Sequence, residues 1–367
     1  MNDFDKRLRD SLTSVQQSYA EERQADRIEM RARFIQRYRS RRRMFVIGSV
    51  ALAGAAVVAV GLVAGGSLDI FADRSPSEVA GRPQEGVSVR VETGKEPIDA
   101  GIRPGGVWVA NAGGSSIAHV DTESNTVVER ILLDGSPQEV DVGENAVWVA
   151  GFGRVTAIDP RTDEILGFAP VGDASDAISI SVGEGAVWAV VGEKSLVRIE
   201  PSTFATDVIE QVEQPVDVAA RDGAIWVVEQ RGVMKLDPAT SEVLGEPITV
   251  PAGQADISAG LGAVWIADKQ DDRLIRIDAA TSAGLKIFEI EGRYLDLAVT
   301  EDAAWVLSSA GGRGLLTAID PVNGTALGAS LELAGDPVEV SIGGGGVWVV
   351  ARSDGSILRI DPERVID

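Results

Sequence analysis

The sequence predicts an all-β protein, a seven-bladed β-propeller with four-stranded blades, preceded by one transmembrane helix and a basic helical tail. Seven tryptophans follow one another at gaps of 40, 40, 38, 39, 40 and 43 residues, each in a phrase such as "AVWVAG". A period near forty with β patterning is typical of propellers, with one blade per repeat. The 41 glycines suit tight turns, and a charge-free apolar run lies between Arg43 and Asp69. The repeated residues are Trp108, Trp148, Trp188, Trp226, Trp265, Trp305 and Trp348.

Residues 1–43 form a basic tail in front of an acidic body. The tail has 12 Lys and Arg against 7 Asp and Glu, whereas the remainder has 22 against 49. The tail is dense in Glu, Gln, Arg and Ala, which predicts a helix. Its arginines suit anionic lipid or a cytosolic partner. The alternative is a solvated helix that only fixes the membrane topology.

Residues 44–66 have the composition of a transmembrane helix. About twenty apolar residues, rising about 1.5 Å each, span the roughly 30 Å hydrocarbon layer. A buried core helix is the alternative, and the 43 preceding residues disfavour a cleaved signal peptide. The basic "RYRSRRR" (37–43) next to the run keeps the N-terminus cytoplasmic. We therefore expect a single-pass protein of the cell membrane, with a linker over 67–85 and an extracytoplasmic propeller over 86–367.

Each repeat contains four expected strands, which we name a, b, c and d from the axis outward. Strand a is short and alternating, as in "QEVDVG" (138–143), and a glycine-rich turn leads to the tryptophan strand b, as in "AVWVAG" (146–151). Strand c ends in an acid that shapes a turn, as in "TAIDP" (156–160), and strand d follows, as in "EILGFAPV" (164–171). In strand b we expect each tryptophan to fill the space between stacked blades.

The last repeat has strands a, b and c but no strand d. The segment "GVSVRVETG" (86–94) precedes the first strand a and has the alternation of a strand d. It is expected to complete the seventh blade, closing the ring and removing its free edges. By strand direction, the b–c and d–a loops then form one face, the top, which points away from the membrane.

Phrases such as "SPQEVDVGENAVWVAG" and "VTAIDPRTDEILGFAPVG" resemble the YVTN-type repeat and virginiamycin B lyase-like propellers of bacteria. The resemblance covers about 86–364 and implies a seven-bladed propeller in a bacterial cell envelope. Propellers host enzymes, binders and scaffolds alike, so it implies no single function. Lyases of this family depend on a histidine of the channel region. No histidine lies on the expected top loops or inner strands here, so the resemblance does not carry that activity.

A column of acids is the candidate binding site. Nine residues before each tryptophan, six blades carry a carboxylate and the third carries Ser179. The next residue is apolar in every blade, so period-two alternation puts acids and apolar residues on opposite sides of strand a. We expect the acids to ring the upper mouth of the central channel. These residues, the channel acids, are Asp99, Glu139, Asp217, Asp256, Asp296 and Glu339.

Two roles remain open for the channel acids. Clustered carboxylates attract positive charge, so the ring suits Ca²⁺, Mg²⁺ or an amine. Alternatively, each acid accepts a backbone N–H from the neighbouring blade as a repeated building device. A Ca²⁺ ion needs oxygens at about 2.3–2.6 Å, and so wide a ring brings together only two or three acids at once. We therefore expect no resident cofactor, keep a divalent cation as an alternative, and leave any metal site unassigned.

The only histidine, His119, lies in strand c and is expected to be an exposed surface residue. Its equivalents in the other blades are mostly basic, and we expect a solvated column. They are Ala157, Arg198, Lys235, Arg276, Ala318 and Arg359.

The sequence favours a non-catalytic binding, scaffolding or sensing module, whose top face meets an unidentified protein or a small cationic ligand. No catalytic residue is assigned, because catalysis needs convergent groups of differing type. The alternative is a lyase or hydrolase that uses the channel acids, with or without a divalent cation. The tail and anchor contact membrane lipid, and in a third interpretation the tail passes extracytoplasmic binding to a cytosolic partner. The acidic body disfavours nucleic acid.

Overall fold

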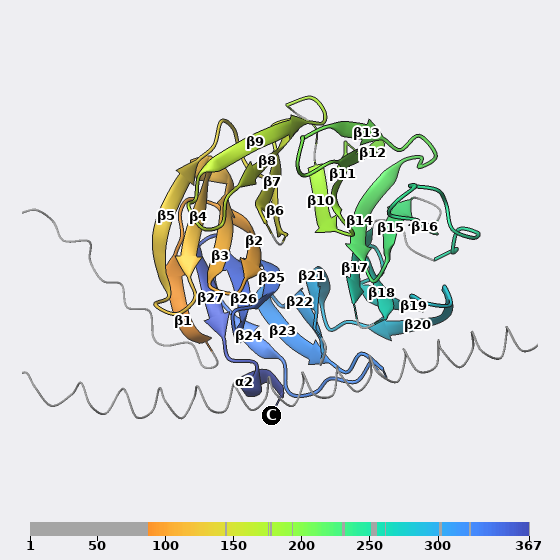
Figure 1. Ribbon diagram of the computed structural model, residues 1–367. Helices are drawn as coiled ribbons and strands as arrows, with labels where there is room; N and C mark the ends of the chain where they lie inside the picture. Colours follow the sequence, from red (N-terminus) through yellow and green to blue (C-terminus); the bar gives the residue numbers. More distant parts are fainter. Residues whose placement is uncertain are drawn as a thin grey trace, which may run out of the picture. The chain divides into compact units, whose positions relative to one another are not determined.

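The computed structural model confirms the seven-bladed propeller. It describes residues 87–366, except 144, 175, 177, 193, 230–231, 251–254, 261, 301–302 and 323. Seven antiparallel sheets surround a common centre (Figure 1). The expected tail (1–43), transmembrane helix (44–66) and linker (67–85) lie outside the described residues. Within the described part, no helix has the length and hydropathy needed to cross a bilayer.

The strands nearest the centre are the seven strands a, which contact one another around the ring. They are β2 (Pro97–Arg103), β6 (Glu139–Val142), β10 (Ile178–Gly183), β14 (Pro215–Arg221), β17 (Ala255–Gly260), β21 (Arg293–Val299) and β25 (Pro337–Gly343). Strands b pair with them and are β3 (Gly106–Asn111), β7 (Val147–Gly151), β11 (Ala186–Val191), β15 (Ala224–Glu229), β18 (Ala263–Asp268), β22 (Ala304–Ala310) and β26 (Gly346–Ala351). Strands c are β4 (Ser116–Asp121), β8 (Arg154–Ile158), β12 (Ser195–Ile199), β16 (Gly232–Leu236), β19 (Arg273–Asp278), β23 (Arg313–Ile319) and β27 (Ser356–Ile360).

Six blades have the outer strand d. These strands are β5 (Thr126–Leu132), β9 (Ile165–Pro170), β13 (Thr206–Val208), β20 (Ala283–Glu289), β24 (Leu331–Leu333) and β1 (Val87–Glu92). Two short helical segments, η1 (Ala112–Gly114) and α2 (Glu363–Ile366), were not expected from the sequence. The second places Val365 in the core beside blades six and seven, where its side chain is 1% exposed.

Blade four has a three-stranded sheet, which differs from the prediction of four strands in every blade. The segment after β16 makes only two isolated bridges to it, through Val243 and Ile248. Between these bridges lie Gly245, in the left-handed region at φ 79°, and Pro247, which has no backbone N–H to donate. The turn and the missing donor prevent a continuous fourth strand.

The predicted closure of the ring is confirmed. β1, from the N-terminal side of the propeller, pairs antiparallel with β27, with Val91 opposite Ile357. The sheet order of blade seven is therefore β25-β26-β27-β1 (Figure 1). The first described strand and the last strand of the chain thus share one blade.

The tryptophans pack between blades, as predicted. All seven are buried, with at most 3% of each residue exposed. Trp226, for example, belongs to a core cluster that also contains Ile257 and Ile266 of the following blade. Repeating this contact at each blade boundary accounts for the forty-residue period in the sequence.

The expectation of an exposed His119 in a solvated basic column is wrong. His119 is paired across strands with Trp108 and stacks on its ring at 4.3 Å between centroids. Its Nδ1 lies 2.8 Å from Asp163 Oδ2 of blade two, and only 14% of its side chain is exposed. In other blades, Lys235 and Arg359 place their cationic groups over the paired tryptophan. The flat indole face attracts cations, so this column contributes to the packing between blades.

The acids that end strands c shape turns, as predicted. The Asp121 carboxylate accepts the backbone N–H of Ser124 at 2.7 Å, and Asp237 accepts that of Thr240 at 2.9 Å. Hydrogen bonds from the turn lower the pKa of both acids. These carboxylates are therefore structural.

Candidate functional site: an acidic central channel

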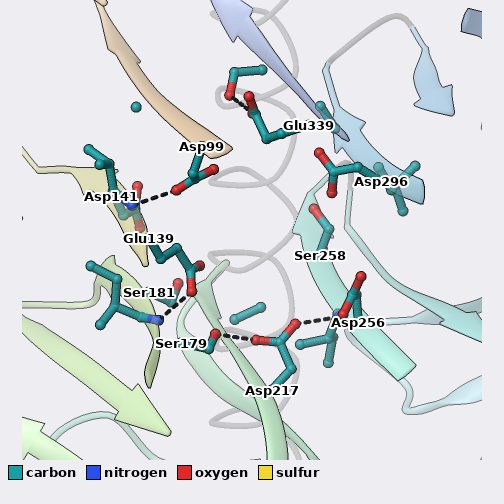
Figure 2. Close-up of a pocket in the computed structure, with 18 of the residues that line it drawn as sticks. Asp99, Glu139, Asp141, Ser179, Ser181, Asp217, Asp256, Ser258, Asp296 and Glu339 are labelled. Atoms are coloured by element: carbon teal, nitrogen blue, oxygen red, sulfur yellow. Dashed lines mark hydrogen bonds between the residues drawn. The ribbon is translucent and has the colours of Figure 1, made fainter. Parts of the chain in front are cut away.

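A cavity of about 680 Å³ occupies the centre of the ring. All six channel acids line it, each from a different strand a, and Figure 2 shows their side chains around one opening. The neighbouring apolar column points the other way, and six of its seven members are buried. Those six are Ala100, Val140, Ile180, Val218, Ile257 and Val340. The predicted alternation is thus present in the structure.

Four channel acids accept a backbone hydrogen bond from the next blade. Asp217 Oδ2 accepts the N–H of Ile257 at 2.9 Å, and Glu139 Oε2 accepts that of Ile180 at 3.1 Å. Asp99 and Asp296 do the same toward Val140 and Val340. In blade three the serine of the column, Ser179, donates its hydroxyl to Asp217 Oδ1 at 2.6 Å. These contacts agree with the building role that the sequence left open.

The other two channel acids, Asp256 and Glu339, have different partners. The Asp256 carboxylate lies 2.6 Å from the Lys269 ammonium. Glu339 accepts the Ser341 hydroxyl through Oε1, while its Oε2 is buried without a hydrogen-bond partner among the described residues. Only 8% of Glu339 is exposed. These two carboxylates are therefore not committed to a backbone bond from the next blade.

Three further residues of the channel were missed by the sequence reasoning. Asp141 lies two residues after Glu139 on the same face of β6, and its Oδ2 accepts the N–H of Val182 at 2.6 Å. It follows from the same alternation, so the pattern could have found it. Tyr294 lies eleven residues before a tryptophan, where four other blades have proline. This departure from the repeat could have marked it as a residue with a separate role. Lys269 reaches the channel from a loop, and no repeated pattern marks it.

The channel combines strong negative charge with burial. Burial raises the pKa of Asp99 and of Asp296 from 3.8 to about 7, and that of Asp217 to about 6. Burial also raises the pKa of Glu139 and Glu339 well above the usual value, and for both the charge of Asp99 is the next cause. Water is partly excluded and the carboxylates repel one another, so the ring retains protons near neutral pH.

Tyr294 adds a buried hydroxyl to the channel. Burial raises its pKa well above the usual value, and the nearby charge of Asp256 contributes. The phenol therefore stays protonated. The two groups do not reach hydrogen-bonding geometry, so within the described part of the chain the Tyr294 hydroxyl has no partner, although the residue is only 4% exposed.

The channel acids do not converge on one point. Among the described residues, no group of three or more Asp, Glu, His or Cys side chains is close enough to hold a metal ion. Such sites need several oxygens within about 2.6 Å of the ion. The spacing instead suits ligands that contact one carboxylate at a time.

No protein-family model and no curated protein matches the sequence. Among solved structures, selenomethionine-substituted virginiamycin B lyase from Staphylococcus aureus is similar, with a TM-score of 0.60 at 16% identity over 74% of this chain and 95% of that one. A streptogramin B lyase gives 0.61 at 14% identity over 75% and 95% of the two chains.

A third similar structure is a catalytically inactive histidine-to-alanine variant of the Staphylococcus aureus lyase with quinupristin, with a TM-score of 0.59 at 16% identity over 74% and 95%. At these identities the likeness shows the fold alone. The chain's single histidine, His119, packs between blades one and two and does not line the channel cavity. The all-β seven-bladed fold is therefore shared with lyases, and the function must be inferred from the channel.

Proposed function

We propose that the protein is a membrane-anchored, extracytoplasmic and non-catalytic binding module whose central channel takes a small cationic ligand. One observation carries the proposal: seven carboxyl side chains line a single cavity, whereas the cationic side chains among the described lining residues are Lys269 and Arg221. This imbalance attracts positive charge, and partial burial strengthens the attraction.

Thermal unfolding of the full-length chain in an uncharged detergent tests this proposal. The probes are 1,4-diaminobutane, spermidine, Mg²⁺ and Ca²⁺, each compared with NaCl at the same ionic strength. Ligand at 100 times its dissociation constant stabilises the folded state by about 2.7 kcal/mol, so the melting temperature should rise by a few degrees.

The triple variant Asp217→Asn, Asp256→Asn and Asp296→Asn should lose that rise. Asparagine keeps the size of each side chain while removing its charge. A flat response of the unaltered chain to every probe, or an equal rise in the triple variant, would overturn the proposal.

The anchor is proposed from the sequence alone. Residues 44–66 are apolar and follow "RYRSRRR" (37–43), a pattern that keeps the N-terminus in the cytoplasm. The full-length chain should stay with membranes after an alkaline carbonate wash, whereas a chain lacking 44–66 should be released. Release of both chains would contradict the anchor.

A lyase or hydrolase is the second candidate, and one observation favours it. Lys269 and Tyr294 bring an ammonium and a phenol close to Asp256, so the channel holds groups of differing type. Mass spectrometry of each organic ligand after incubation with the chain separates the two candidates. Binding alone returns the ligand unchanged, whereas time-dependent cleavage that the triple variant lacks would establish an enzyme.

A further inference from the structure

The unpartnered polar atoms of the channel lie in two consecutive blades, next to a third blade that carries an acid paired with a lysine. Glu339 Oε2 in blade seven and the Tyr294 hydroxyl in blade six have no hydrogen-bond partner among the described residues. The third member is Asp256 in blade five, whose charge is felt by Tyr294. We name these three residues the open arc. The open arc excludes the channel acids that accept a backbone N–H from the next blade, including Asp296 of blade six.

Buried polar atoms without partners are uncommon in folded proteins. Both residues line the channel cavity, so their polar atoms lie next to the space that a ligand would occupy. An ionised carboxylate oxygen only accepts hydrogen bonds, whereas a protonated carboxyl can also donate, and a phenol oxygen accepts as well as donates. A bound cation favours the ionised form of Glu339, whose missing partner is then a donor, and a second donor can serve Tyr294 beside Asp256.

The chain itself places a primary ammonium in this part of the channel. Lys269 Nζ lies 2.6 Å from Asp256 Oδ1, and 41% of the lysine side chain is exposed. An ammonium has three N–H groups that can point to separate acceptors. It therefore needs no convergence of three carboxylates, which the described part of the channel does not provide.

We propose that the open arc is the seat of an aliphatic diamine, with one ammonium donating to Glu339 Oε2 and the other to the Tyr294 oxygen beside Asp256. This inference rests on the proposed function and names its ligand class and its contact residues. The cavity of about 680 Å³ holds far more than a single ion. The surplus of carboxylates over cations in the channel favours a ligand with more than one positive charge.

Isothermal titration of the full-length chain with 1,4-diaminobutane tests the seat. Glu339→Gln removes one charge and the unpartnered acceptor, so binding should weaken at least about tenfold, as expected for losing a charge-assisted hydrogen bond. The matched control is Glu139→Gln, which removes the same charge from the ring, while the glutamine oxygen can still accept the Ile180 N–H. It should weaken binding by no more than about threefold, the screened effect of one distant charge.

Tyr294→Phe supplies an independent test that leaves the charge of the channel unchanged. It should weaken diamine binding about threefold to tenfold, the usual range for one hydrogen bond. It also serves if Glu339→Gln fails to fold, which melting curves of each variant would reveal. Normal affinity in a folded Tyr294→Phe chain would remove that residue from the seat.

The possible results distinguish failure of the diamine seat from failure of cation binding by the channel. No binding of 1,4-diaminobutane or any other cation by the unaltered chain would overturn both. Equal losses in Glu339→Gln and Glu139→Gln would keep the cationic channel and overturn the seat. Displacement of the diamine by Mg²⁺ at matched ionic strength, with a lower dissociation constant for the metal, would overturn the amine as the ligand class.

Discussion

Two sets of channel acids occupy equivalent positions in the repeat and yet have different partners. The first set accepts a backbone N–H from the next blade and consists of Asp99, Glu139, Asp217 and Asp296. The second set is Asp256 and Glu339, one of which contacts Lys269 while the other keeps a buried oxygen without a partner among the described residues. Equivalent acids in the repeat therefore do not all have the same role. Four acids join blades, and two remain available to a ligand.

Blades seven and one are joined by contacts other than a backbone N–H donated to a channel acid. The Ser341 hydroxyl lies 2.6 Å from the Ala100 carbonyl oxygen across this joint and shares its one hydrogen between that oxygen and Glu339 Oε1. β1 then completes blade seven by pairing with β27. We therefore expect β1 to contribute strongly to the stability of blade seven, whose channel acid, Glu339, makes no such bond to blade one among the described residues.

Deleting residues 86–94 from the full-length chain should have the largest effect. The deletion removes the β1–β27 ladder and the buried Val91. At about 1 kcal/mol for each hydrogen bond and about 2 kcal/mol for the valine, the free energy of unfolding should fall by at least about 5 kcal/mol. Differential scanning calorimetry should show a melting temperature lower by about 10 °C or more. An unchanged melting temperature would mean that β1 does not hold the ring closed.

Lowering the pH should separate the buried channel acids from the acids that shape the turns after strands c. Asp99 and Asp296 have a folded-state pKa of about 7, against about 3.9 in an unfolded chain. Their stabilising contribution is fully present below the unfolded pKa and is lost as the pH rises through about 7. Acidification from pH 7 to pH 5 should therefore stabilise the ligand-free chain by at most about 2 kcal/mol for each group, less where channel water screens the charges.

Melting temperatures between pH 8 and pH 5 measure this effect. The turn acids, such as Asp121, have a lowered pKa, so their stabilisation is lost only as the pH falls below about 4. Asp99→Asn combined with Asp296→Asn should flatten the curve. A melting temperature that falls steadily from pH 8 to pH 5 would contradict the raised pKa values.

The propeller could be predicted from the sequence because every blade is formed by one copy of a repeated pattern. The tryptophan spacing depends on packing between blades, and every repeat must satisfy it. The inward direction of the channel acids follows from the period-two alternation of strand a. Even the closing strand was predictable, because the last repeat lacks the piece that 86–94 supplies.

The partners of the channel acids could not be predicted in the same way. Whether an acid reaches the next blade depends on the local positions of its neighbours, which the repeated pattern does not encode. Lys269 reaches Asp256 from a loop whose path has no periodicity. The burial of His119 was not predicted, because the equivalent residues of the other blades share mostly a positive charge. Its position depends instead on cross-strand pairing with Trp108.

Truncating an acid of the first set should cost more stability than neutralising one of the second. Asp217 accepts hydrogen bonds from Ser179, Val218 and Ile257. Asp217→Ala leaves these donors without their acceptor and should lower the free energy of unfolding by about 2 kcal/mol. Glu339→Gln removes a buried charge that lacks a full set of partners, so it should change stability by less than about 1 kcal/mol or increase it. Urea unfolding of both variants at pH 8 measures the difference, and equal losses would erase the distinction between the two sets.

The smallest effect on stability is expected at Lys269, which is paired with Asp256 of the second set. Lys269→Met removes a partly exposed ion pair with Asp256, and such pairs contribute at most about 1 kcal/mol. The same change makes the channel more negative and frees an acceptor of the open arc, so diamine affinity should rise about twofold to fivefold, as measured by titration. Stability and affinity therefore move in opposite directions, because in the unaltered chain the lysine ammonium competes with the ligand for Asp256. A fall in affinity would show instead that Lys269 holds the open arc in its binding geometry.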